Sequence, residues 1–120
     1  MAYEHGLGLR VTRKHRDGVS VALPIRPDLL NSTGVLHGGV IASLADEAAW
    51  FAIREHFQEE RPCTTTELKV NYLRPIAGSK VLGRAYLLRA GKILCVTRVD
   101  VFDEQRRLAA TSIVTYMLLP

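Results

Sequence analysis

The hydrophobic pattern is strongest from Val40 onward, where Ala, Leu, Ile and Val recur without an intervening Pro or Gly. Ala and Leu are strong helix formers, so this run predicts a long helix. We expect it to end within residues 55–58, where the sequence becomes polar, before the break at Arg61-Pro62. The apolar residues fall on every side of the helical wheel, which is typical of a buried helix.

Alternating or β-rich patterns predict strands in the rest of the chain. The expected strands are residues 10–15, 19–23, 64–72, 80–89, 93–103 and 108–119. Asp17-Gly18 is a hairpin signal, and turns are also expected at 74–78, 90–92 and 104–107. Residues 1–9 and 27–30 can each form one helical turn.

Hairpin-length loops join the later strands, which favours antiparallel pairing. The pattern therefore predicts an α+β fold in which a curved, mostly antiparallel six-stranded sheet wraps one long central helix. Such a sheet leaves open edges and a half-covered helix, and both features predict self-association.

Composition adds limits to this picture. The chain has 120 residues, which fits a single domain spanning 1–120, with 48% hydrophobic and 23% charged residues. The net charge of +4 comes from dispersed Lys and Arg, so no nucleic-acid partner is expected. Cys63 and Cys95 are expected to be free, buried thiols. With no signal-like or membrane-spanning stretch, we expect a soluble cytoplasmic protein without a membrane partner.

Asp46 is the unusual residue of the predicted helix. A carboxylate among apolar residues is costly unless it is paired, hydrogen-bonded or placed in a wet cleft. Two interpretations stay open at this point: a structural partner for Asp46, or a cleft in which the carboxylate performs chemistry.

The pair Gly38-Gly39 directly precedes the predicted helix. Adjacent glycines permit unusual backbone geometry and close approach of a ligand. The free N–H groups at a helix start attract an anion, or a carbonyl oxygen that becomes one. Gly38 and Asp46 are eight residues apart, about 12 Å along a helix, too far to act on one reacting group. If both act on one substrate, they come from two chains at a two-fold interface.

Several common catalytic and metal-binding motifs are absent from the sequence, including the Gly-x-Ser-x-Gly elbow, the Walker loop and His or Cys clusters with metal spacing. We therefore predict no metal and no cofactor. The remaining candidates lie in residues 31–46 and in Thr64-Thr65-Thr66.

The motif Asn31-x-x-Gly34-x-x-His37-Gly38-Gly39, followed by Ala45-Asp46, resembles the hallmark of hotdog-fold acyl-CoA thioesterases of the phenylacetate-pathway (PaaI-like) type. The segment Asn71-Tyr72-Leu73-Arg74-Pro75 resembles the usual end of that family's third strand. The resemblance covers roughly residues 19–118. It implies a hotdog fold, an acyl-CoA substrate, and a homodimer that pairs into a dimer of dimers.

The same resemblance implies roles for five residues. Asp46 would activate water or attack the thioester carbonyl, and the Gly38 N–H of the other subunit would polarise that carbonyl. Asn31 would help to place the carbonyl or the water, and His37 would shape the turn. Thr65 would supply a hydroxyl that helps to hold the water.

Other positions are less specific. Thr66 is a neighbour that could replace Thr65. Gly39 belongs to the expected substrate-binding turn. The turn Arg89-Ala90-Gly91-Lys92 resembles the segment near the nucleotide end of coenzyme A, and its charge suits phosphates, although it also fits an ordinary solvated turn.

Two other functions stay open from the sequence. A hotdog enoyl-CoA hydratase or dehydratase would use His37 and Asp46, and a non-catalytic acyl-CoA binding module would not require Asp46. The acyl group is not readable, because Trp50, Phe51 and Tyr72 could line an aryl pocket or belong to the core.

Overall fold

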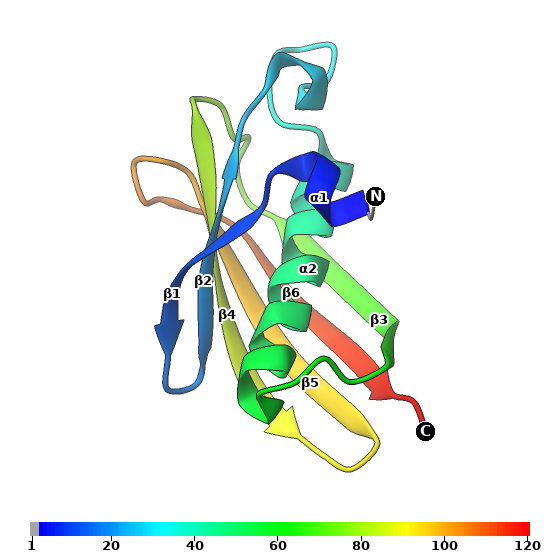
Figure 1. Ribbon diagram of the computed structural model, residues 1–120. Helices are drawn as coiled ribbons and strands as arrows, with labels where there is room; N and C mark the ends of the chain where they lie inside the picture. The colour runs from blue at the N-terminus through cyan, green and yellow to red at the C-terminus, as the bar shows by residue number, and fades with distance from the viewer. Residues whose placement is uncertain (1–2) are drawn as a thin grey trace.

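The computed structural model describes residues 3–120, and it consists of a curved six-stranded sheet with one long helix on its concave face (Figure 1). The elements in chain order are α1 (Tyr3–Leu7), β1 (Arg10–His15), β2 (Gly18–Pro24), the 3-10 turn η1 (Pro27–Leu29), α2 (Gly38–Phe57), β3 (Cys63–Tyr72), β4 (Lys80–Ala90), β5 (Leu94–Phe102) and β6 (Leu108–Leu118). The predicted α+β architecture and its six strands are confirmed. Met1 and Ala2 lie outside the described residues.

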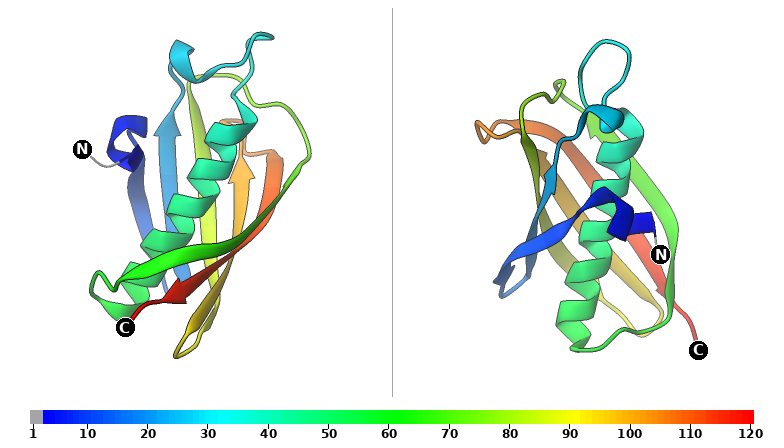
Figure 2. Two further views of the ribbon diagram at one scale, coloured as in Figure 1. Left: turned by 90° about the vertical axis from the view of Figure 1, so that its right-hand side faces the viewer. Right: turned by 45° about the horizontal axis from the view of Figure 1, so that its top comes forward.

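The strand order is β1-β2-β4-β5-β6-β3, and every neighbouring pair is antiparallel. The helix α2 lies between β2 and β3 in the sequence, so the chain crosses the concave face before β3 joins the far edge beside β6. The edges are therefore β1 and β3, on opposite sides of α2 (Figure 2).

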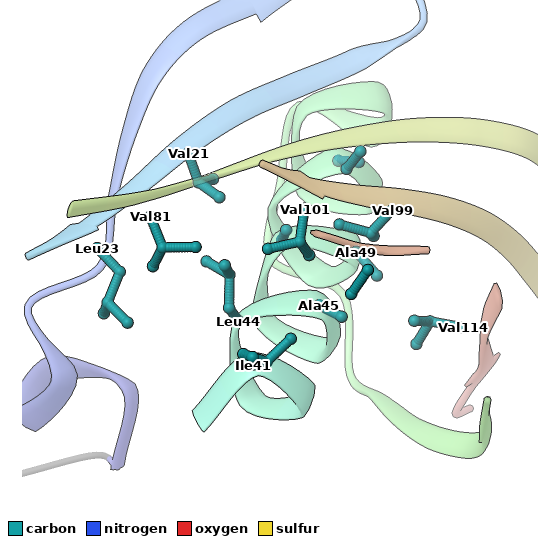
Figure 3. Close-up of a cluster of buried hydrophobic side chains, with 14 of the residues drawn as sticks. Val21, Leu23, Ile41, Leu44, Ala45, Ala49, Val81, Val99, Val101 and Val114 are labelled. Carbon is teal, nitrogen blue, oxygen red and sulfur yellow. The ribbon is translucent and has the colours of Figure 1, made fainter. Parts of the chain in front are cut away.

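The core forms between the sheet and one face of α2. Ile41, Leu44, Ala45 and Ala49 face side chains of β2, β4, β5 and β6, as Figure 3 shows. The facing side chains are those of Val21, Val81, Val99, Val101 and Val114. The small alanines of α2 let the helix approach the sheet closely, while the branched side chains of the strands fill the space between them.

The opposite face of α2 is only half covered. This agrees with the half-covered helix expected from the sequence, because Asp46, Glu47 and Trp50 are all partly exposed in the single chain. The sheet curves around one side of the helix and leaves the other side uncovered. In the part of the chain that the structure describes, no helix is long and apolar enough to cross a membrane.

The edge strand β3 also exposes apolar side chains. Leu68 and Tyr72 lie opposite Val114 and Ala110 of β6, which are buried, so all four share the inner face of the sheet. Leu68 and Tyr72 are nevertheless 38% and 53% exposed. A strand with free backbone groups and exposed inward-facing residues is typical of a surface that pairs with another chain.

Candidate active site

The helix α2 begins at Gly38, two residues earlier than predicted, because His37 caps it. His37 has extended backbone angles (φ −60°, ψ 135°), and its Nδ1 accepts a 2.8 Å hydrogen bond from the Gly39 N–H. The expected unusual backbone at the glycine pair is wrong, since neither Gly38 nor Gly39 has a positive φ. Gly39 leaves room for the cap, because a Cβ there would make a tight contact of 3.0 Å with the His37 Nδ1.

The first N–H groups of α2 are almost all occupied. The Val40 and Ile41 N–H groups donate to the His37 carbonyl oxygen at 2.9 and 3.3 Å, and the Gly39 N–H donates to the His37 ring. Among residues 3–120, the Gly38 N–H has no acceptor. Of the donors expected at this helix start, Gly38 alone is available to a ligand.

A small cleft of about 300 Å³ lies beside Gly38, between the start of α2 and the segment after β3. The Tyr72 hydroxyl donates a 2.7 Å hydrogen bond to the Gly38 carbonyl oxygen, which anchors the first turn of α2 to the end of β3. Tyr72 also lines this cleft, so it belongs to the surroundings of Gly38 and not to the core.

A second cleft, of about 340 Å³, contains Asp46. Asp46 is half-buried, and its Oδ1 accepts a 2.7 Å hydrogen bond from the Thr65 hydroxyl of β3. Trp50 lines the same cleft, and both Trp50 and Phe51 pack against the hydrophobic core. The Asp46 carboxylate therefore has a structural partner and also lies in a cleft.

A β-bulge decides which threonine meets Asp46. The pairing of β3 with β6 shifts between Thr65 and Glu67, so Thr66 is the extra residue. Its hydroxyl donates to the Thr115 carbonyl oxygen at 3.3 Å. Thr65 alone of the two donates to Asp46.

Sequence reasoning missed Tyr116 and the position of Cys63. The Tyr116 hydroxyl donates a 3.0 Å hydrogen bond to the backbone carbonyl oxygen of Asp46, and burial raises the pKa of this phenol. Burial also raises the pKa of the Cys63 thiol, and the neighbouring Cys95 and Asp46 raise it further by smaller amounts. Cys95 is buried as expected, but Cys63 is only half-buried and lines the Asp46 cleft.

Asn31 has a local role in the loop before α2. Its Oδ1 accepts hydrogen bonds from the Thr33 N–H (2.9 Å), the Thr33 hydroxyl (2.8 Å) and the Val35 N–H (3.3 Å). Asn31 is exposed and lines neither of the two clefts. In the single chain, its side chain closes the loop that leads into α2.

The turn with Arg89, Gly91 and Lys92 joins β4 to β5 near the C-terminal end of α2 (Figure 1). The Gly91 N–H donates to the Leu94 carbonyl oxygen at 2.9 Å. Arg89 lines a separate groove with Ala52 and Glu55 of α2. The structure therefore does not bring this turn into either the Asp46 cleft or the Gly38 cleft.

Gly38 and Asp46 are not brought together within one chain. Both lie in the continuous helix α2, and their eight-residue separation corresponds to about 12 Å along its axis. The two clefts share no lining residue. Within residues 3–120, no group of three His, Cys, Asp or Glu side chains converges as a metal site.

Comparison with known proteins decides the family. The family model for the thioesterase superfamily matches residues 33–110, which include α2 and the strands β3 to β5. The chain belongs to the thioesterase superfamily. The Escherichia coli K12 protein named medium/long-chain acyl-CoA thioesterase YigI is 31% identical over 133 residues, covering 98% of this chain and 86% of that protein.

Solved structures agree with this thioesterase family. The thioesterase HI1161 from Haemophilus influenzae has a TM-score of 0.87 at 26% identity, covering 94% of this chain and 79% of that one. A mutant of the phenylacetic acid degradation protein PaaI from Thermus thermophilus has a TM-score of 0.85 at 28% identity, covering 98% of each chain. The hotdog fold, the PaaI-like resemblance and the assignment to the thioester hydrolases are confirmed.

Proposed function

We propose that this thioesterase hydrolyses acyl-CoA thioesters to the free acid and coenzyme A, with Asp46 as the reacting carboxylate. The observation that carries the proposal is the position of Asp46 in an open cleft, with its Oδ1 held by the Thr65 hydroxyl at 2.7 Å. The name of the Escherichia coli relative supports acyl-CoA as the substrate class.

The reaction requires a base, a donor for developing charge and a positioned carbonyl. Asp46 accepts a proton from water while the water oxygen bonds to the thioester carbon, and the carbonyl oxygen becomes an oxyanion. The carbon–sulfur bond then breaks, and the coenzyme A thiolate takes up a proton. Direct attack by Asp46, giving a mixed anhydride that water hydrolyses, uses the same carboxylate and stays open.

The oxyanion donor in this proposal is the Gly38 N–H of a second subunit. The donor must lie about 3 Å from the oxyanion, which the separation of about 12 Å within one helix does not permit. The unoccupied Gly38 N–H supports this role, because its neighbours already have acceptors. One two-fold dimer then contains two equivalent sites.

Two surfaces support a homodimer. The edge strand β3 exposes Leu68 and Tyr72 on the inner side of the sheet, and α2 leaves one face half covered beside Asp46. A second copy that covers both surfaces removes apolar area from water and brings another Gly38 toward the Asp46 cleft. A dimer of dimers, a single domain over 1–120 and a cytoplasmic location stay predictions from the sequence.

The surrounding residues take supporting roles. Trp50 in the Asp46 cleft and Tyr72 in the Gly38 cleft would line the path of the acyl group once the two clefts meet. Asn31 stays a predicted catalytic residue that helps to place the carbonyl or the water. Gly39, Arg89, Gly91 and Lys92 stay predicted substrate contacts. His37 uses Nδ1 to cap α2 and lines neither of these clefts, so no observation favours the hydratase alternative.

The test is a thiol-release assay with short, medium, long and aromatic acyl-CoA substrates on the wild type and Asp46→Asn. We expect kcat to fall by about 10³-fold in Asp46→Asn, while binding of acyl-CoA is retained. Glu55→Gln is the matched control, since Glu55 lies on the same helix, pairs with Lys14 at 3.4 Å and is outside the Asp46 cleft. Unchanged turnover of Asp46→Asn would remove Asp46 from the mechanism.

A further inference from the structure

The outer face of the sheet, away from α2, carries a groove of about 620 Å³ that is rich in basic side chains. Its size is within the range of roughly 300–1,000 Å³ that small-molecule sites occupy. We call it the basic groove and define it by Arg10, Arg13, Lys80 and Arg106 around the apolar Leu82 and Phe102.

Strand register explains why these side chains meet. Arg10 lies opposite Ala22, Ala22 opposite Leu82, and Leu82 opposite Phe102, so one row crosses β1, β2, β4 and β5 on a single face. Residues next to this row, such as Val21 and Val81, point to the other face and pack in the core. The basic groove is therefore separated from the Asp46 cleft by the sheet itself.

Most of the charge in the basic groove is not neutralised. Arg10, Arg13 and Arg106 form no ion pair with any acidic residue whose side chain the structure describes, whereas Lys80 lies near Glu104. Arg84, at the wall of the groove, differs because it pairs with Asp17 at 2.6 Å. Several unpaired cations around one cavity create a positive potential that attracts a multiply charged anion.

A floor of Leu82 and Phe102 beside these cations suits a ligand that has both phosphates and a flat, partly apolar body. Arginine matches phosphate oxygens with its planar set of donors, and aromatic or aliphatic side chains pack against a nucleobase. A second copy of the chain fits poorly, because a two-fold contact would bring like charges together.

We propose that the basic groove binds a nucleoside phosphate. The ligand is either a free nucleotide or the nucleotide end of a second coenzyme A molecule, separate from any substrate in the Asp46 cleft, and these two ligands share this chemistry. The site is distinct from the Asp46 cleft, so its existence does not depend on the proposed hydrolysis.

Isothermal titration calorimetry on the wild-type protein at low ionic strength tests the site. The probes are ADP, adenosine and inorganic pyrophosphate. We expect ADP to bind more tightly than either fragment, and its binding to weaken as salt is added. No measurable binding of ADP at millimolar concentrations, or equal binding of adenosine, would overturn the proposal.

Variants locate the site. Arg10→Ala and Arg13→Ala should each weaken ADP binding about tenfold through loss of a charge-assisted contact. The matched control is Arg98→Ala, whose guanidinium lies 4.4 Å from the Tyr86 ring and outside the groove, and which should change binding less than about twofold. Equal effects of all three variants, or an altered oligomeric state in Arg13→Ala, would contradict the assignment.

A competition experiment distinguishes the two sources. If coenzyme A displaces ADP from the wild type, and Arg13→Ala weakens the binding of coenzyme A about as much as it weakens the binding of ADP, the ligand is the nucleotide end of coenzyme A. If saturating coenzyme A leaves ADP binding unchanged, the ligand is a free nucleotide. ADP binding should persist in Asp46→Asn, so failure of the catalytic proposal and failure of this site give different results.

Discussion

The Thr65 hydroxyl and the Asp46 carboxylate are joined by a 2.7 Å hydrogen bond that links β3 to the middle of α2. The β-bulge at Thr66 lets β3 present Thr65 to the helix while it keeps pairing with β6. A hydrogen bond to an ionised carboxylate is stronger than one between neutral groups, so Thr65 holds Asp46 in one orientation. In the proposed mechanism, this hydrogen bond makes the reactivity of Asp46 depend on a residue of the edge strand.

Thr65→Val should lower kcat about tenfold, because the valine keeps the shape of the side chain but loses the hydroxyl. Thr65→Ser should restore most of the activity, and KM should change less than kcat in both variants. Steady-state kinetics with one acyl-CoA measure both constants. Thr66→Val is the control, since the Thr66 hydroxyl bonds to the Thr115 carbonyl oxygen, and a loss of kcat equal to that of Thr65→Val would contradict this account.

His37 should prove to be a helix cap. His37→Ala should destabilise the protein by about 1 kcal/mol in urea unfolding, because the Gly39 N–H loses its acceptor. His37→Asn should recover much of that loss, since asparagine is a favourable N-cap residue. If His37 were the base, both variants would lose activity alike by about 10³-fold, whereas the cap predicts that His37→Asn stays active.

The turn between β5 and β6 should make stability depend on acid pH. Asp103 is 1% exposed, and its Oδ1 accepts a 2.9 Å hydrogen bond from the Arg107 N–H while its Oδ2 meets the Arg107 Nε at 2.7 Å. The hydrogen bond from the Arg107 N–H and, to a smaller extent, the one from the Arg107 guanidinium hold the pKa of Asp103 below the usual 3.8. Because the pKa of Asp103 is lower in the folded protein than in the unfolded chain, its carboxylate stabilises the folded state at pH values above the pKa of the unfolded chain. This stabilisation is lost as the pH falls through the pKa of the folded state.

Urea unfolding of the wild type and Asp103→Asn between pH 6 and pH 2 measures this contribution. The wild type should be the more stable protein at pH 6, and its advantage should shrink below about pH 4, as Asp103 becomes protonated. The other carboxylates titrate equally in both proteins, so the difference isolates Asp103. A difference that stays constant across this range would show that the Asp103 carboxylate contributes nothing through its charge.

The elements of the fold and the pairing within hairpins can be predicted from local patterns, but the first residue of α2 cannot. The sequence predicts the start of α2 at Val40, because two adjacent glycines are typical of a turn. In the structure Gly38 and Gly39 are the first residues of α2, because His37 caps the helix. The His37 Nδ1 accepts a hydrogen bond from the Gly39 N–H, and a Cβ at Gly39 would make a tight contact with that ring. A cap of this kind uses a ring nitrogen in place of the usual hydroxyl or carboxylate, so composition alone does not reveal it.

The sequence singles out Asp46, the proposed reacting acid, but not its surroundings. Asp46 can be identified because a carboxylate in an apolar helix needs an explanation. Tyr116 and Cys63 meet beside Asp46 through the pairing of β3 with β6, in which Thr65 lies opposite Tyr116, 51 positions later in the chain. Their positions follow from register and from the bulge at Thr66, and no short stretch of sequence contains that information.

The proposed contribution of a second subunit to the site can be tested with a variant that removes the Gly38 N–H. Proline is well tolerated at the first position of a helix, and the extended angles of His37 suit a residue before proline. Gly38→Pro should therefore fold and lower kcat by about 10²–10³-fold. Gly38→Ala keeps the N–H, and its Cβ would lie 3.5 Å from the Tyr72 ring, an ordinary contact, so most activity should remain.

The most direct test of the central claim is the activity of mixed dimers in which one subunit carries Asp46→Asn and the other carries Gly38→Pro. Two different tags allow the mixed dimers to be purified away from the two inactive parent proteins. If Gly38 of one subunit serves Asp46 of the other, each mixed dimer contains one intact site and should recover about half of the wild-type activity. Mixed dimers that stay as inactive as their parents, or a protein that remains a monomer, would contradict a site shared between subunits.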